Sequence, residues 1–167
     1  MDITRPNMVV SVIQHPPAFG GKVKAIDDKA ALAVPGVVAV KAIPQGVVVY
    51  AKDTYAAMKG RNALNVDWDL SQAETRSTET MLRDYMAQAA NPGTQCEANG
   101  DTAKALAGAA KTIEATYVFP YLAHAPMEPM DSVIEPKAGG ADFWCGSQFQ
   151  VGDTSAVAGV LGAIEVA

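Results

Sequence analysis

The first seventy residues alternate short apolar runs with turn residues, a pattern that predicts strands and two short helices. Runs rich in Val and Ile that close on Pro or Gly favour strands, and an aspartate before an Ala-rich stretch favours a helix start. Asp53 is the expected N-cap of the second helix, and Asp27 or Asp28 that of the first. The expected strands are residues 8–14, 22–26, 37–43, 47–51 and 63–69, and the expected helices are residues 29–34 and 54–62.

The unit of strand, aspartate, short helix and strand therefore occurs twice within residues 5–70. Neither copy alone can bury its apolar face, so the two copies are expected to share one layer. The predicted class is α+β, with short helices covering one face of a mixed sheet. This core is assigned to residues 1–70.

Residues 71–110 are expected to form a helical linker segment. Ser77 can cap a helix that runs to about Ala90, because the following residues carry one apolar stripe at helical spacing. Asp101 or Thr102 can cap a shorter, Ala-rich helix that ends near Ala110.

Residues 111–167 form the third predicted region. Apolar residues alternate cleanly over residues 112–119, which predicts a strand with Ile113, Tyr117 and Phe119 on one face. Residues 131–136 and 141–145 are expected to form a hairpin whose turn uses Gly139 and Gly140. A last helix is expected to begin near Asp153 or Thr154.

Composition and charge narrow the functional classes. Hydrophobic residues make up 49% and charged residues 19%, which is typical of a folded globular chain. The net charge is -5 and no Lys or Arg cluster occurs, so no nucleic-acid partner is expected. No apolar run reaches the roughly 18 residues of a membrane-spanning helix. Cys96 and Cys145 have no zinc-like spacing and are expected as two free thiols, with one disulfide as the alternative.

Two loop segments carry candidate chemistry, AHAPMEP at residues 123–129 and WCGSQFQ at residues 144–150. Functional groups concentrate on loops that rigid strands hold. His124 and Glu128 are candidate site residues, although a hydrogen-bonded structural histidine is the alternative for His124. Gly146, Ser147 and Gln148 follow a strand and can bind a polar group, with a plain structural turn as the alternative. No complete Ser/His/Asp set or phosphate-binding glycine motif is present.

A family resemblance joins these features. FGGKV at residues 19–23, AVPGV at 33–37, residues 49–57 and ALNVDWD at 63–69 resemble the α/β hammerhead domain of molybdenum hydroxylase large subunits, the xanthine dehydrogenase and aldehyde oxidoreductase family. Within this family, the sequence is similar to the isoquinoline 1-oxidoreductase beta subunit and its aldehyde dehydrogenase relatives. ATY at residues 115–117, PYLAHAPMEP at 120–129 and residues 144–150 resemble the start of the molybdopterin-binding domain.

The resemblance implies a fragment of an oxidoreductase that hydroxylates aldehydes or N-heterocycles with oxygen derived from water. It implies a molybdenum cofactor of the molybdopterin cytosine dinucleotide type and iron-sulfur clusters on a partner subunit. The remainder of the large subunit would be a further partner. The compartment stays open between bacterial periplasm, inner-membrane surface and cytoplasm.

The resemblance also assigns roles. Gln148 would hydrogen-bond an oxygen ligand of the molybdenum, and Gly146, Ser147 and Phe149 would shape the cofactor loop. His124 and Glu128 would line the site. No residue here corresponds to the family's catalytic Glu, so the isolated chain is expected to be inactive. A fragment is also expected to expose apolar surface where the rest of the subunit would pack, and to self-associate through it. Two alternatives are a non-catalytic assembly or binding module, and a hydrolase that uses His124 and Glu128.

Overall fold

The computed structural model describes residues 3–127, 130–162 and 165–166 of the 167-residue chain. The chain divides into two compact units, which are described separately below. One unit is Asn7–Thr112, and the other combines Met1–Pro6 with Ile113–Ala167. The predicted division at residues 70 and 110 stays a prediction.

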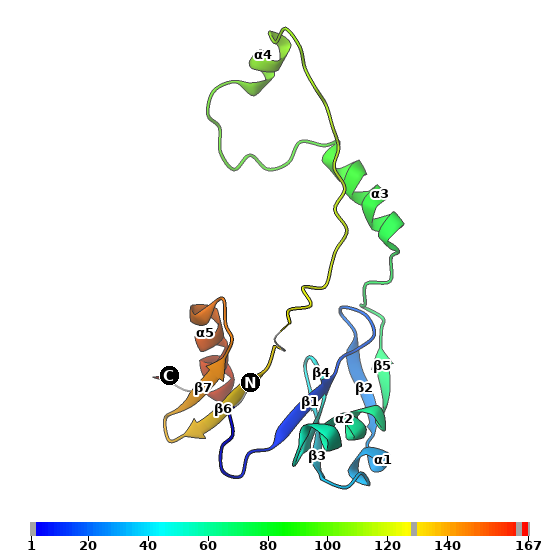
Figure 1. The fold of residues 1–167 in the computed structure, drawn as a ribbon. Coiled ribbons are helices and arrows are strands. Elements are labelled where there is room, and N and C mark those ends of the chain that lie inside the picture. Colours follow the sequence, from blue (N-terminus) through cyan, green and yellow to red (C-terminus); the bar gives the residue numbers. More distant parts are fainter. Residues whose placement is uncertain (1–2, 128–129, 163–164, 167) are drawn as a thin grey trace. The chain divides into compact units, whose positions relative to one another are not determined.

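The centre of the first unit is a three-stranded antiparallel sheet in the order β1-β4-β3. These strands are β1 (Val10–Gln14), β3 (Val37–Ile43) and β4 (Gly46–Ala51), and β4 lies between the other two (Figure 1). The side chains of Val47 and Val49 on β4 are fully buried. A near-continuous apolar run is typical of a strand that is covered on both faces, and β4 accordingly supplies most of the core.

A second, two-stranded antiparallel sheet pairs β2 (Lys22–Asp27) with β5 (Asn65–Asp69). The predicted α+β class is confirmed, and all five strands lie where the sequence indicates. They form two antiparallel sheets, whereas a single mixed sheet was expected. The difference arises because β1 and β3 occupy both edges of β4. The strand β2 therefore pairs with β5 in a sheet of its own.

Helix α2 (Thr54–Asn62) covers the larger sheet, with the short α1 (Lys29–Leu32) beside it. Asp53 caps α2 as predicted, since its Oδ1 accepts a hydrogen bond from the Ala56 backbone N at 2.8 Å. Asp28 occupies the N-cap position of α1 but makes no side-chain capping bond. Gly60 lets α2 approach the sheet closely, because an added Cβ would lie 2.7 Å from Val37 Cγ2 and 2.9 Å from Val49 Cγ1.

Two more helices follow, α3 (Thr78–Ala89) and α4 (Thr102–Ala107). Their predicted caps are confirmed: Ser77 accepts from the Thr80 backbone N and Asp101 from that of Lys104. Neither helix contains a buried residue. The caps, rather than packing onto the sheets, therefore define where these helices begin.

An ionic cluster fixes the segment before α3. Arg76 Nη2 lies 2.6 Å from Glu74 Oε2, and Arg76 Nη1 lies 2.9 Å from Asp84 Oδ2. The hydrogen bonds from Arg76 lower the pKa of Glu74 from 4.5 to about 2. The favourable interaction is fully present above pH 4.5 and is lost as the pH falls towards 2, since protonation of Glu74 removes its charge.

Replacing Arg76 with Ala is expected to return the pKa of Glu74 towards 4.5. The side-chain ¹³C shift of Glu74 in an NMR titration measures this change directly. Arg83→Ala is the matched control, because Arg83 contacts Thr80 and not Glu74. A Glu74 titration that is the same with and without the Arg76 side chain would contradict the assignment.

The second unit is built on an antiparallel hairpin of β6 (Ser132–Lys137) and β7 (Gly140–Cys145). The helix α5 (Gln150–Leu161) follows β7, and the short β8 (Glu165–Val166) then pairs with β7 in parallel. The predicted hairpin is confirmed, and Gly139 takes the left-handed φ of 82° that its turn needs. The amino-terminal segment joins this unit through Arg5. Its Nη2 lies 2.7 Å from Glu135 Oε2, and its guanidinium lies 5.4 Å from the centre of the Trp144 ring.

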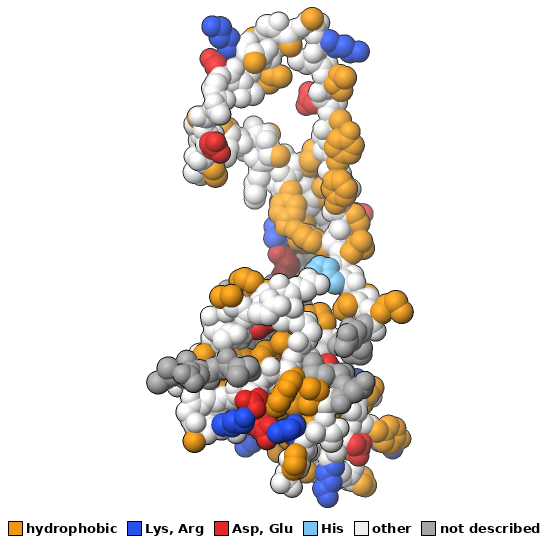
Figure 2. Space-filling view, turned by 60° about the vertical axis from the view of Figure 1, so that its left-hand side comes forward, with side chains coloured by type: hydrophobic (Ala, Val, Ile, Leu, Met, Phe, Trp, Pro, Cys, Tyr) orange, Lys and Arg blue, Asp and Glu red, His pale blue; other side chains and the backbone are white. Residues whose placement is uncertain are grey.

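The predicted strand at residues 112–119 is wrong. This segment has no regular structure, and Ile113, Tyr117 and Phe119 are 85%, 78% and 84% exposed. An alternating sequence can become a strand only when a neighbouring strand accepts its backbone hydrogen bonds, and no described strand pairs with it. Figure 2 shows large apolar side chains standing on the surface of the molecule. Among the described residues, no helix is long and apolar enough to cross a membrane.

Candidate functional site

The candidate cofactor loop, residues 146–149, connects the end of β7 to the start of α5. Ser147 organises it. The Ser147 hydroxyl donates a short hydrogen bond to Asp153 Oδ2, and its oxygen accepts one from the Phe149 backbone N at 3.0 Å. The Gln150 side-chain amide donates to the Ser147 carbonyl at 3.1 Å. The loop is therefore an ordered turn with side-chain bonds at both ends.

Helix α5 begins at Gln150, earlier than the start that was predicted near Asp153 or Thr154. The Asp153 backbone N donates to the Phe149 carbonyl at 3.1 Å, which makes Phe149 the N-cap position. Asp153 thus lies inside the first turn and does not cap the helix. Its carboxylate bonds Ser147 instead, a role that the sequence interpretation missed.

Gln148 is an exposed residue of this loop. Among the described residues its side chain makes no hydrogen bond, while its neighbours Ser147 and Phe149 are both tied. An amide offers two donor hydrogens and one acceptor oxygen, so Gln148 presents free hydrogen-bonding groups on a fixed backbone. This arrangement suits recognition of a polar ligand.

Phe149 and Gly152 form the other side of the turn. Phe149 is 71% exposed, and its ring lies directly over Gly152, where an added Cβ would be 2.3 Å from Cε1. Gly152 therefore lets the ring lie flat against the helix. Gly146 differs, because an added Cβ there would meet nothing within 4 Å. The space beside Gly146 is open.

His124 lies in the extended segment of residues 113–127 and is exposed. Within the described part of the chain, it makes no hydrogen bond or ion pair with the Gly146–Gln150 loop. Glu128 lies outside the described residues. Among the described residues, no hydrogen bond thus joins His124 to Ser147 or to another nucleophile, although the hydrolase alternative would require one.

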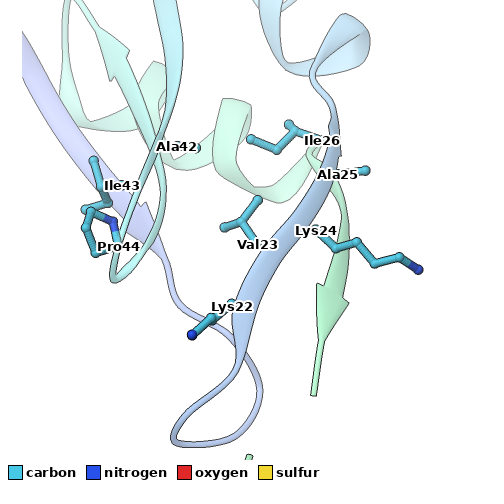
Figure 3. Close-up of a pocket in the computed structure, with 8 residues that line it drawn as sticks. All are labelled: Lys22, Val23, Lys24, Ala25, Ile26, Ala42, Ile43 and Pro44. Carbon is cyan, nitrogen blue, oxygen red and sulfur yellow. The ribbon is translucent and has the colours of Figure 1, made fainter. Parts of the chain in front are cut away.

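The described residues of the first unit line open hollows. One, of about 680 Å³, is lined by Lys22–Ile26 and Ala42–Pro44. Figure 3 shows Val23 and Ile26 turned towards the strand that carries Ala42, and Lys24 pointing away. Lys24 Nζ lies 3.0 Å from Asp67 Oδ2, and the hydrogen bond that Lys24 donates to this carboxylate raises the pKa of Lys24. The second hollow, of about 590 Å³, lies beside His15 and Phe19. The lining of the first is mainly apolar and carries no acid or base other than lysine.

Metal ligands and thiols are also placed by the structure. Over the described ranges, no group of three or more His, Cys, Asp or Glu residues is arranged to hold a metal ion. Cys96 and Cys145 are free thiols, as expected, with Cys96 exposed and Cys145 half-buried. Any metal held near the loop would therefore need other ligands, such as the donor atoms of an organic cofactor.

The chain has counterparts among known proteins. Residues 87–166 match the molybdopterin cofactor-binding domain. The chain is 28% identical over 175 residues to the beta chain of isoquinoline 1-oxidoreductase from Brevundimonas diminuta, covering 97% of this chain and 22% of that protein. It is 27% identical over 166 residues to a nicotinate dehydrogenase subunit of Pseudomonas putida, covering 88% of this chain and 13% of that protein.

The fold has a counterpart among solved structures. The crystal structure of quinoline 2-oxidoreductase from Pseudomonas putida 86 matches with a TM-score of 0.65 and 15% identity, over 98% of this chain and 26% of that one. The chain thus spans less than a quarter of the length of the curated relatives that it matches. The match over residues 87–166 and the two curated relatives support a place in the molybdenum hydroxylase family.

Proposed function

We propose that the chain forms part of the cofactor-binding subunit of a molybdenum-dependent oxidoreductase that hydroxylates aldehydes or N-heterocycles with oxygen from water. The observation that carries the proposal is Gln148, whose unpaired, exposed amide stands on a loop fixed on both sides. The loop lies within the residues that match the cofactor-binding domain. Gln148 would offer its amide to the oxygen atoms of the cofactor, and Gly146, Ser147 and Phe149 would shape the loop.

The residues present fit such a group. A molybdopterin is rich in oxygen and nitrogen atoms, which the amide of Gln148 can meet as donor or acceptor. The open space beside Gly146 leaves room for a ligand to approach the backbone. When bound, the cofactor supplies the redox chemistry, while the protein contributes binding, orientation and electrostatics.

The proposal extends to partners. The remainder of the subunit would complete the site, and a partner subunit with iron-sulfur clusters would receive the electrons. The cofactor would be of the molybdopterin cytosine dinucleotide type, and the isolated chain would be inactive. His124 and Glu128 are proposed as residues that line the site when the remainder of the subunit is in place.

A second candidate function is supported by the exposed segment of residues 113–127. Phe119, Tyr121 and Leu122 are each at least 79% exposed, and such apolar surface is typical of a region that another protein surface covers. The chain would then serve as a non-catalytic module for subunit assembly or binding. The cofactor content of the natural protein separates this function from the first.

The test is metal and pterin analysis of the natural gene product beside the isolated 167-residue chain. We expect about one molybdenum and one pterin per natural protein, and neither on the isolated chain. Mass spectrometry counts the metal, and fluorescence of the oxidised pterin detects the organic part. Absence of both from a natural protein prepared with active cofactor synthesis would contradict the oxidoreductase proposal and favour the assembly module.

A further inference from the structure

Ser147 uses its hydroxyl group in two directions at once. The hydroxyl donates to Asp153 Oδ2, six residues further along the chain, and accepts from the Phe149 backbone N at 3.0 Å. A serine hydroxyl has one proton and two lone pairs. Because the hydroxyl proton points to the carboxylate of Asp153, a lone pair of the Ser147 oxygen can accept the hydrogen bond from the Phe149 amide.

These bonds bracket Gln148. One end of the bracket is Ser147, whose carbonyl also accepts from the Gln150 side chain at 3.1 Å. The other end is Phe149, whose amide is held by the Ser147 oxygen. The backbone on both sides of Gln148 is therefore restrained, although the Gln148 side chain itself is exposed.

We propose that Asp153 is a positioning residue for Gln148: its carboxylate orients the Ser147 hydroxyl, which fixes the loop so that the Gln148 amide faces the cofactor. This inference rests on the proposed function, because it needs Gln148 to act on a bound molybdopterin. A hydrogen bond to an ionised carboxylate is stronger than one between neutral groups, so Asp153 is suited to holding the loop.

The side chain of Asp153 is not needed to start α5. Its backbone N already bonds the Phe149 carbonyl at 3.1 Å, as any residue at this place in the helix could. The carboxylate is thus available for Ser147. The Asp153→Asn variant removes the charge of this side chain and keeps its shape. It therefore distinguishes a positioning role from a purely structural one.

The first experiment is a double-mutant cycle in the natural, cofactor-loaded protein. Asp153→Ala is expected to lower kcat roughly tenfold, the lower end of the loss that follows removal of a group behind a binding residue. KM and molybdenum content are expected to be retained. The variant that combines Asp153→Ala with Gln148→Ala is expected to be no slower than Gln148→Ala alone, because both act through one group. Asp153→Asn keeps an acceptor oxygen for Ser147 and should recover part of kcat.

A second readout does not depend on activity. Hydrogen exchange of the Phe149 amide is expected to become faster in Asp153→Ala, because its acceptor, the Ser147 oxygen, is no longer oriented. Ser155→Ala is the matched control, since the Ser155 hydroxyl donates to the Val151 carbonyl within the same helix at 2.9 Å. That variant should leave the Phe149 exchange rate unchanged.

The outcomes separate the two proposals. A molybdenum-free natural protein, or a Gln148→Ala variant with unchanged kcat, would overturn the proposed role of Gln148 and with it the positioning role. If Gln148→Ala lowers kcat as expected, and adding Asp153→Ala to that variant lowers kcat by the same factor as it does alone, only the positioning role is overturned. Unchanged exchange of the Phe149 amide in Asp153→Ala would overturn it as well.

Discussion

Replacing Gln148 with Ala in the natural, cofactor-loaded protein is expected to lower kcat by about 10²-fold to 10³-fold. Removal of one preorganised hydrogen-bond donor from a reaction centre has effects of this size. The loop backbone should survive, because the bonds that shape it belong to Ser147, Phe149 and Gln150. The expected loss is therefore in turnover, with molybdenum and pterin content close to that of the unmodified protein.

The measurement is steady-state turnover per bound molybdenum, so that incomplete loading does not mimic a catalytic defect. Gln95→Ala is the matched control, because Gln95 is also an exposed glutamine but lies in the other unit. Equal turnover in Gln148→Ala and Gln95→Ala would remove Gln148 from the site. Loss of molybdenum rather than of turnover would change its role from orienting the cofactor to retaining it.

Replacing Gly46 with Ala is expected to destabilise the Asn7–Thr112 unit by about 3 kcal/mol, the sum of backbone strain and overpacking that each cost roughly 1–3 kcal/mol. Gly46, the first residue of β4 after the turn from β3, has a φ of 148°. A Cβ there would lie 2.2 Å from the Gln14 carbonyl oxygen, an atom of the neighbouring strand backbone. Neither the turn nor β1 can move without disturbing β4.

Urea unfolding, followed by a probe within this unit, measures the change as a lower transition midpoint. Gly93→Ala is the matched control, because Gly93 has no positive φ and an added Cβ would meet nothing within 4 Å. It should change stability by less than about 0.5 kcal/mol, as surface substitutions usually do. A Gly46→Ala midpoint equal to that of Gly93→Ala would show that the turn relaxes freely.

Local patterns were sufficient for elements whose signals lie close together in the chain. The bounds of α2 agree with the prediction because Asp53 caps it and the small residues behind the cap face the sheet. The hairpin of β6 and β7 was predictable because its turn lies at Gly139. In each case the residues that decide the structure are a few positions apart.

Patterns failed where structure depends on distant partners. The alternation of residues 112–119 shows which side chains could share a face, but it cannot show whether a second strand lies beside them. At the site, the resemblance indicated Gln148, but sequence patterns assigned Asp153 no role beyond the start of a helix, because its bond to Ser147 spans a turn whose shape the sequence does not show. The roles of His124 and Glu128 stay predictions.

The bond between Arg5 and Glu135 has a consequence for the order in which the chain folds during synthesis. The two residues are 130 positions apart, and the whole Asn7–Thr112 unit lies between them. Domains generally fold as units, in the order in which they leave the ribosome. The unit at residues 7–112 can therefore fold before Glu135 is synthesised, so Arg5, which is made before this unit, pairs with Glu135 only after the unit has formed.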